Sequence, residues 1–131
     1  MDLSSAPSGR SYIALPIDAT QGFPQSFSFA FNTVTYLFSL YVNVQADQLS
    51  AEDGDLFDLP TDIAFLVLRV DVENAEGARS TLFLRKVVPE LEYTAGPIAL
   101  YFPEQVIARQ NLNGMGDFGS RMTGGIAQRW A

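Results

Sequence analysis

The sequence predicts an all-β fold, an antiparallel β-sandwich or flattened barrel of six to seven strands with an extended glycine-rich C-terminal arm. Three observations lead to this prediction. Apolar and polar residues alternate over 26–32 and 34–44, as they do in strands with one buried face. A second pair of such segments, 63–73 and 78–88, is separated by a short turn. Half of the ten glycines lie within 114–125, a composition that is unusual for a core segment.

The chain has the size and composition of one folded domain. Its 131 residues are 47% hydrophobic and 18% charged, which excludes a chain that is disordered throughout. With 8 basic and 15 acidic residues the net charge is −7, so nucleic acid and anionic membrane surfaces are poor partners. No window approaches about 18 uninterrupted apolar residues, and residues 1–10 lack a signal-peptide pattern. We therefore expect no membrane partner, no nucleic-acid partner, and synthesis in a cytoplasm.

The residue types that are missing restrict the chemistry. The chain has no Cys and no His, and Lys86 is its one lysine. Thiolate nucleophiles, disulfides, imidazole bases and Cys- or His-ligated metals are therefore excluded. Carboxylates, Tyr, Ser and Arg remain, which is a poor set for catalysis at neutral pH. We expect a protein that is not an enzyme and has no catalytic residues, metal site or cofactor.

The first part of the chain predicts an edge strand over 12–17, where Pro16 is tolerated, followed by a hairpin. The first hairpin strand places three rings on one face, and we interpret them as core residues: Phe27, Phe29 and Phe31. After a turn near 32–33, the second strand, 34–44, is rich in β-branched and aromatic residues.

An acidic segment lies in the middle of the chain. Residues 46–62 hold six of the 15 acidic residues and no basic residue. Gly54 and Pro60 interrupt the segment, which predicts a loop. The loop is either solvated or in contact with a basic partner surface, and its candidate contact residues are Asp53, Asp55 and Asp58. A calcium site is a further alternative, but the order of acidic residues and glycine does not match an EF-hand loop.

A second hairpin and one more strand complete the predicted body, residues 1–102. Gly77 lies in the turn of the hairpin 63–88 and suits a position with positive φ. Residues 98–102 form a short apolar strand, and we expect Pro103 to end it.

The connection 89–97 contains a close pair of carboxylates, Glu90 and Glu92. Glycoside hydrolysis uses two such groups on opposite sides of a cleft. The sequence indicates no cleft at this place, so a hydrolase is the catalytic alternative rather than the expectation.

The last 29 residues, 103–131, differ from the body. Residues 103–112 begin with a proline, which suits the first turn of a helix, and predict a helix of two turns. Glycines then alternate with the residue types that are enriched at interface hot spots. The side chains that we expect to contact a neighbouring subunit are Phe118, Arg121, Met122, Arg129 and Trp130.

Charge also sets this arm apart. The body holds 5 basic and 13 acidic residues, whereas the arm holds 3 basic and 2 acidic residues. The arm is therefore complementary in charge to a second copy of the body. A tail that packs on its own domain and a frayed terminus are the alternatives.

Residues 24–43, PQSFSFAFNTVTYLFSLYVN, resemble a small domain found in bacteriophage tail and baseplate proteins. The shared pattern is a strand of proline, polar residues and phenylalanines, then a polar turn, then a tyrosine-rich strand that ends in Asn. The resemblance implies a virion structural protein with no catalytic residues. We therefore expect a subunit of a tail, baseplate or neck, which forms rings through its strand edges and C-terminal arm. Its partners are then copies of itself and other virion proteins.

The alternative function is a carbohydrate- or receptor-binding β-sandwich. Such a module stacks sugars on exposed aromatic rings, and the acidic loop would then hold a calcium ion. The candidate rings are Tyr41, Tyr93, Tyr101 and Trp130.

Overall fold

The computed structural model describes residues 2–3, 6–44, 56–61, 64–74, 76–112 and 114–130. Within these residues the chain forms strands and two 3₁₀ turns, and no α-helix. Six strands have seven or more residues: β3 (Gln25–Phe31), β4 (Val34–Val44), β6 (Ala64–Glu73), β7 (Arg79–Val87), β9 (Ile98–Ala108) and β10 (Arg121–Gln128). Four strands are shorter: β1 (Asp2–Leu3), β2 (Tyr12–Ala14), β5 (Leu56–Asp58) and β8 (Glu92–Ala95). The 3₁₀ turns are η1 (Ala19–Gln21) and η3 (Arg109–Asn111).

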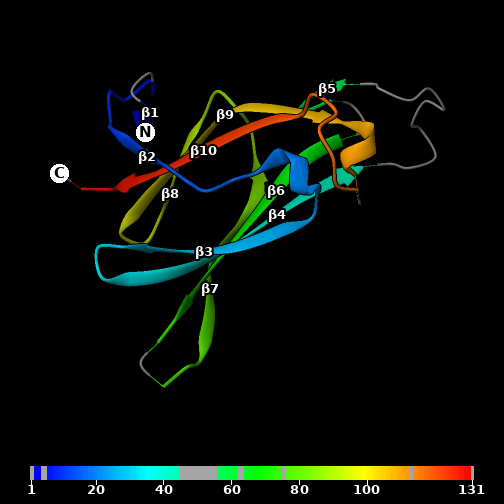
Figure 1. Ribbon diagram of the computed structural model, residues 1–131. Coiled ribbons are helices and arrows are strands. Elements are labelled where there is room, and N and C mark those ends of the chain that lie inside the picture. Colours follow the sequence, from blue (N-terminus) through cyan, green and yellow to red (C-terminus); the bar gives the residue numbers. More distant parts are fainter. Residues whose placement is uncertain are drawn as a thin grey trace.

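The strands form two antiparallel sheets, so the predicted all-β sandwich is confirmed (Figure 1). The first sheet has the order β1-β2-β10-β9-β5. β5 and β8 share one edge of β9, where β8 pairs with the start of β9 and β5 pairs with its end. The second sheet has the order β3-β4-β6-β7. The N-terminal and C-terminal strands therefore lie side by side in the first sheet, and the two predicted hairpins form the second.

The core lies between the two sheets. Alternate residues of β4 and β6 point inward and meet side chains of β9 and β10. The largest fully buried apolar side chains there are Tyr36, Phe38, Leu40, Leu66, Leu68, Val70, Ile98, Leu100, Phe102, Ile107 and Ile126. Each such side chain stabilises the fold by about 1.5–3 kcal/mol. Three rings of β3 pack against this core but are only partly buried: Phe27, Phe29 and Phe31.

β9 continues past Pro103, so the predicted end of the strand at this residue and the predicted helix over 103–112 are wrong. The proline is tolerated because the pairing of β9 with β10 shifts register between Thr123 and Gly125. Such a bulge leaves one residue of a strand without a ladder partner, and proline has no N–H to offer one. The last residues of β9 are buried and pair with β5. The η3 turn, directly after β9, is the helical part of the segment that was predicted to be a helix.

β10 belongs to the sandwich, so the division into a body of residues 1–102 and an arm of residues 103–131 is corrected. The strand lies between β2 and β9 and pairs with both. A Cβ atom at Gly124 would overlap the buried ring of Phe102, so a glycine is needed at this close approach. The alternative of a C-terminal segment packed on its own domain is correct for β10. In β10 the glycine at position 124 allows two strands to pack closely, and it does not mark an extended arm.

Two short strands also differ from the predictions. β8 lies within the predicted connection 89–97 and pairs with the start of β9 through a turn at Gly96, whose φ is 55°. The predicted strand 12–17 is shorter, because β2 ends before Pro16. β1 covers the outer edge of β2, so β2 is not the edge strand that was expected.

The N-terminal segment covers the outer face of the first sheet. The ring of Tyr12 lies 5.6 Å from the ring of Tyr101 of β9, measured between centroids. These two rings form a second, smaller apolar cluster together with three alanines: Ala6, Ala99 and Ala127. The first sheet is thus buried on both faces in this region.

Both predicted hairpins are present, and their turns have positive φ angles. Gly77, in the turn between β6 and β7, has a φ of 83°, as predicted. The turn between β3 and β4 consists of Asn32 with φ 50° and Thr33 with φ 67°. Two consecutive residues with positive φ are the geometry of a type I′ turn, for which Asn-Gly is the preferred sequence.

Thr33→Gly is therefore expected to raise the free energy of unfolding by about 1 kcal/mol, because a β-branched residue is strained at positive φ and glycine is not. The measurement is urea unfolding followed by circular dichroism. As a control, Thr35→Gly in the extended backbone of β4 should lower stability by about 0.5–1 kcal/mol. A loss of stability in Thr33→Gly would contradict the turn geometry.

Gly124→Ala is expected to destabilise the fold by about 2 kcal/mol, because the added methyl group overlaps the fully buried ring of Phe102. In a separate arm the same change would be neutral or slightly stabilising. Urea unfolding of Gly124→Ala, Phe102→Leu and the double variant tests the contact. The double variant should lose clearly less stability than the sum of the two single variants.

Candidate interaction surface

The C-terminal residues predicted to bind a neighbour do not form one surface. Met122 is 5% exposed and packs in the main core, so its prediction as a contact residue is wrong. The reason is the alternation of β10, which turns this side chain inward. Arg121 of β10 forms an ion pair with Glu104 of the neighbouring strand β9, with 3.2 Å between Nε and Oε2. Phe118 is 42% exposed and lies in the loop that precedes β10.

Arg129 and Trp130 form an exposed pair after the other end of β10. The guanidinium carbon of Arg129 lies 5.0 Å from the centroid of the Trp130 ring, which is 64% exposed. Arg129 also donates a hydrogen bond to the carbonyl oxygen of Gly96 at 3.4 Å. Roughly 25 Å of strand separates this pair from Arg121, at a rise of about 3.3 Å per residue. The pair stays a predicted contact, at a different place from the loop of Phe118.

Only one of the predicted acidic contact residues can be placed. Asp53 and Asp55 lie outside the described residues, and Asp58 is exposed at the end of β5 opposite Val106 of β9. Among the residues that the structure describes, no three acidic side chains are arranged to hold a metal ion.

The carboxylate pair considered for hydrolysis is divided by the fold. Glu90 is exposed in the turn before β8, whereas Glu92 lies on the outer face of the first sheet beside the N-terminal segment. Oε1 of Glu92 accepts hydrogen bonds from the hydroxyl groups of Ser8 and Tyr12 and from the guanidinium group of Arg10. Oε2 accepts the backbone N–H of Ser8 at 2.7 Å. Both oxygens of Glu92 are thus used to hold the N-terminal segment.

The titration of this cluster fits a structural clamp. Burial acts to raise the pKa of Glu92, but the hydrogen bonds from Ser8 and Tyr12 and the charge of Arg10 outweigh it and hold the pKa below its ordinary value of 4.5. Burial and the hydrogen bond to Glu92 raise the pKa of the Tyr12 hydroxyl well above its ordinary range. The carboxylate stays charged and the phenol stays protonated at neutral pH, so neither exchanges a proton there.

The aromatic side chains considered for carbohydrate binding are not gathered in one place. Tyr93 and Tyr101 are each 7% exposed, Tyr93 in the main core and Tyr101 in the outer cluster. Tyr41 lies on the outer face of the second sheet, and Trp130 follows β10. No pair of these rings forms a platform in the described structure.

The edges of the two sheets differ in how they are protected (Figure 1). In the described part of the chain the first sheet ends in short strands, since β1 has 2 residues, β5 has 3 and β8 has 4. Short edges offer few free backbone groups to another chain. The second sheet ends in long strands, with 7 residues in β3 and 9 in β7.

β7 has features that prevent another strand from pairing with it. Arg79, Arg85 and Lys86 lie along it and are exposed. Its pairing with β6 also shifts register between Val70 and Asp71, which marks a bulge. Exposed cations and bulges are two of the ways in which natural proteins protect a sheet edge.

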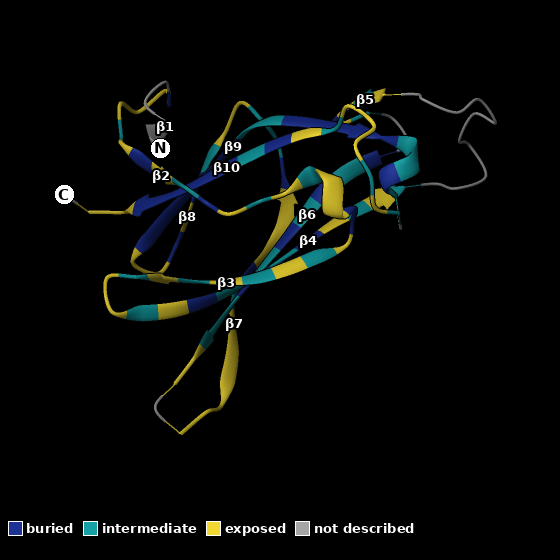
Figure 2. Ribbon diagram, in the orientation of Figure 1, coloured by how far each residue is buried: buried dark blue, intermediate teal, exposed yellow. Residues whose placement is uncertain are grey.

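β3 has neither form of protection. No charged residue occurs between Asp18 and Asp47. β3 pairs with β4 over its whole length without a register shift, and no described strand lies on its other side. Its outward residues are small and exposed, and they alternate with the partly buried rings (Figure 2): Ser26, Ser28 and Ala30. β3 is therefore an uncharged, regular edge of seven residues, which we call the β3 edge.

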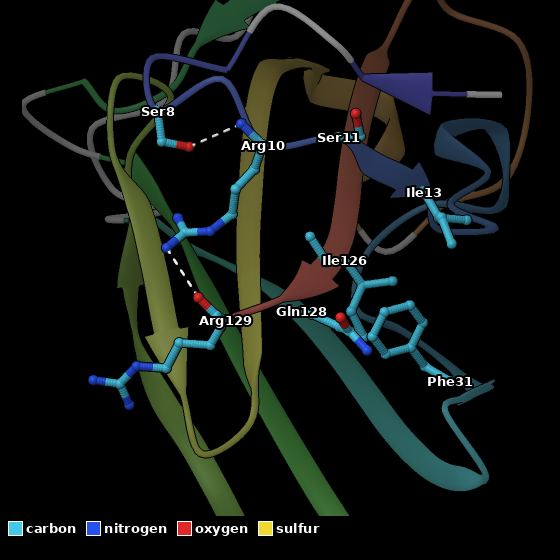
Figure 3. A pocket seen from close by; sticks show the side chains of 9 residues that line it. Ser8, Arg10, Ser11, Ile13, Phe31, Ile126, Gln128 and Arg129 are labelled. Atoms are coloured by element: carbon cyan, nitrogen blue, oxygen red, sulfur yellow. Dashed lines mark hydrogen bonds between the residues drawn. The ribbon is translucent and has the colours of Figure 1, made fainter. Parts of the chain in front are cut away.

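An open pocket of about 530 Å³ lies beside Phe31, the last residue of β3, and is lined also by the N-terminal segment, Ile13 of β2 and the end of β10. Figure 3 shows the ring of Phe31 beside Ile126 and Gln128 of β10. The guanidinium groups of Arg10 and Arg129, which also line the pocket, point away from this ring. The last residue of β3 therefore borders an open space.

The alternation in β3 predicts that its phenylalanines lie in the core, but it does not indicate the free edge. The available signal was the uncharged segment 19–46, in a chain whose net charge is −7. Period-two alternation shows which face of a strand is buried, but it does not show whether the strand has one neighbour or two.

Comparison with known proteins adds no relative. The chain matches no protein-family model, no curated protein and no solved structure. In the described residues, no helix is long and apolar enough to cross a membrane.

Glu92→Gln is expected to lower the free energy of unfolding by about 2 kcal/mol at pH 7, because its hydrogen bonds are assisted by charge. The folded-state pKa lies below 4.5, so the contribution of the carboxylate is present above about that pH. It is lost as the pH falls through the lower, folded-state value. Urea unfolding at a series of pH values should show the two proteins converging in acid.

Glu90→Gln is the matched control, since this side chain is exposed two residues away. Its stability should stay within about 0.5 kcal/mol of the unmodified chain at every pH. An equal effect of both substitutions, or a Glu92→Gln difference that does not change with pH, would contradict the clamp.

Proposed function

We propose that the protein is a virion structural subunit, part of a bacteriophage tail, baseplate or neck, and that it joins a neighbouring subunit through the β3 edge. Two observations support the proposal. The segment that resembles phage tail and baseplate proteins, residues 24–43, coincides with β3 and nearly all of β4. β3 is also the long edge that lacks protection in the described structure. The proposed role requires no catalytic group, cofactor or metal.

The β3 edge is the observation that carries the proposal. An edge strand presents unpaired backbone N–H and C=O groups, which another strand can satisfy by extending the sheet. The same sheet protects its other edge, β7, with three cations and a bulge. The contrast within one sheet indicates that β3 is left open for a partner.

The side chains of β3 are already arranged for such a contact. The ring of Phe27 stacks on Phe38 of β4, with 5.2 Å between centroids and 18° between planes. The rings of Phe29 and Phe31 also pack against the core and are partly buried. An added strand would cover these rings without first having to order them, and preorganisation of this kind strengthens association.

Arg129 and Trp130 supply a second proposed contact. Both lie beyond the end of β10, and the indole is 64% exposed. Trp and Arg are the residue types that contribute most often to binding energy at interfaces. An exposed arginine also suits a neighbour with the acidic composition of this chain.

Ser28→Lys tests the β3 edge. We expect the unmodified chain to associate, with a mass by light scattering above the 14.4 kDa of one chain, and Ser28→Lys to associate at least about tenfold more weakly. A charge at the middle of the edge must be desolvated or displaced before another strand can pair. Ser80→Lys is the matched control on β7, and it should keep the mass of the unmodified chain. A monomeric unmodified chain, or equal effects of both lysines, would contradict the proposal.

Membership of a virion is tested by mass spectrometry of purified particles of the virus that encodes the chain. A structural subunit is expected in many copies per particle, in fixed ratio to the other structural proteins. Absence of the chain from intact, infectious particles would overturn the virion assignment and leave the β3 edge to be explained by another assembly.

A further inference from the structure

We infer that the neighbour of β3 is the β3 strand of a second copy of this chain, which runs antiparallel to the first about a two-fold axis beside Ser28. This inference rests on the proposed function, because it names the partner of the same edge. The two second sheets would then continue into one sheet of eight strands, with two β3 strands at its centre.

The first argument concerns charge. Each chain carries a net charge of −7, so two copies repel each other unless they meet at a neutral surface. Residues 19–46 carry no charge, and they include the whole of β3 and β4. Two β3 strands can therefore pair without placing like charges opposite each other, an arrangement that destabilises a sheet.

The second argument concerns which faces meet. When two identical edges are joined by a two-fold axis perpendicular to the sheet, the strands run antiparallel and the inner faces stay on the same side. When the axis lies along the strands, they run parallel and the inner face of one copy continues into the outer face of the other. β3 has phenylalanines inward and small residues outward. Only the antiparallel arrangement places rings beside rings and small residues beside small residues.

The third argument fixes the register. β3 has seven residues, so an axis beside its middle residue, Ser28, pairs the strand over its full length. Phe27 of one copy then lies opposite Phe29 of the other, and the reverse pair forms as well. Ser28 lies opposite Ser28 of the second copy, and Ser26 opposite Ala30. Cross-strand aromatic pairs are among the stabilising pairs in antiparallel sheets.

Gln25 of the second copy would end beside Phe31, where the open pocket lies. The incoming strand therefore covers the one ring of β3 that faces this pocket. A two-fold contact of this type is closed, since each copy uses its β3 edge once. It makes the dimer a building block, and larger assemblies need another surface, for which Arg129 and Trp130 are the proposed contact.

A cysteine scan tests the axis directly, because the chain has no cysteine of its own. The variants are Ser26→Cys, Ser28→Cys and Ala30→Cys on β3, with Ser80→Cys on β7 as the control. Opposite residues in antiparallel strands have Cα atoms about 4.5–5.5 Å apart, within the span of a disulfide. Under mild oxidation we expect Ser28→Cys alone to give a product of twice 14.4 kDa in high yield.

A pair of double variants tests the orientation without oxidation. In Ser26→Lys with Ala30→Glu, the lysine of each copy lies opposite the glutamate of the other copy. Two pairs of opposite charges therefore form between the β3 strands, and this variant should keep the dimer. Ser26→Lys with Ala30→Lys places like charges there and should weaken the dimer by about tenfold or more. Circular dichroism of each double variant checks that the substitutions leave the fold intact.

The outcomes separate this inference from the function on which it rests. A disulfide at Ser26 or Ala30 alone would overturn the register. If no cysteine on β3 forms a disulfide while Ser28→Lys still dissociates the assembly, β3 pairs with a different segment or in parallel, and only the further inference fails. If the unmodified chain is monomeric and no cysteine forms a disulfide, the inference fails together with the proposed role of the β3 edge.

Discussion

β10 approaches β9 so closely at Gly124 that no side chain fits between its backbone and the ring of Phe102. This contact places Phe102 in the core and allows β10 to pair with β9 along most of its length. β10 in turn pairs with β2, which brings the N-terminal segment onto the outer face of the first sheet. The Glu92 clamp, the outer apolar cluster and the packing of the two sheets all depend on this one close approach.

The two sheets differ in how their edges are protected in the described structure. β10 and the N-terminal strands complete the first sheet, and its edges are short in the described structure. In the second sheet no described strand pairs with the outer edge of β3. The two edges of this sheet are long and differ in protection against pairing with another strand. β7 carries cations and a bulge, and β3 carries neither. The proposed interface at β3 rests on this asymmetry rather than on any particular hot-spot residue.

Several features of the chain were predictable from local patterns. Period-two alternation located both hairpins, and Gly77 was recognised as a turn residue with positive φ. Two predictions failed for a common physical reason. The segment that forms β8 was predicted to be a connection, and the second half of β9 was predicted to be a helix over 103–112. Both segments contain Pro, Gly or charged residues that disfavour a strand in isolation, and pairing with β9 or β10 outweighs that preference.

The residues predicted to contact a partner also show a difference between what the sequence predicts and what the tertiary structure decides. Met122 and Trp130 have similar interface propensities in the sequence, but the alternation of β10 buries the first, whereas the second lies beyond the end of the strand and is exposed. Asp53 and Asp55 lie outside the described residues, so their prediction stands as it was. Glu90 and Glu92 are two residues apart in the chain, and only one of them meets the N-terminal segment.

By itself, the sequence determined the fold class, the two hairpins of the second sheet and the residue types that exclude cysteine and histidine chemistry. These properties depend on composition and on periods of two residues, which are local. Only the tertiary structure decided that the glycine-rich end is a central strand, that Glu92 is a clamp, and that β3 is an edge of the second sheet among the described strands. Each of these depends on which strands become neighbours, and neighbours in a sheet are set by contacts between residues far apart in the chain.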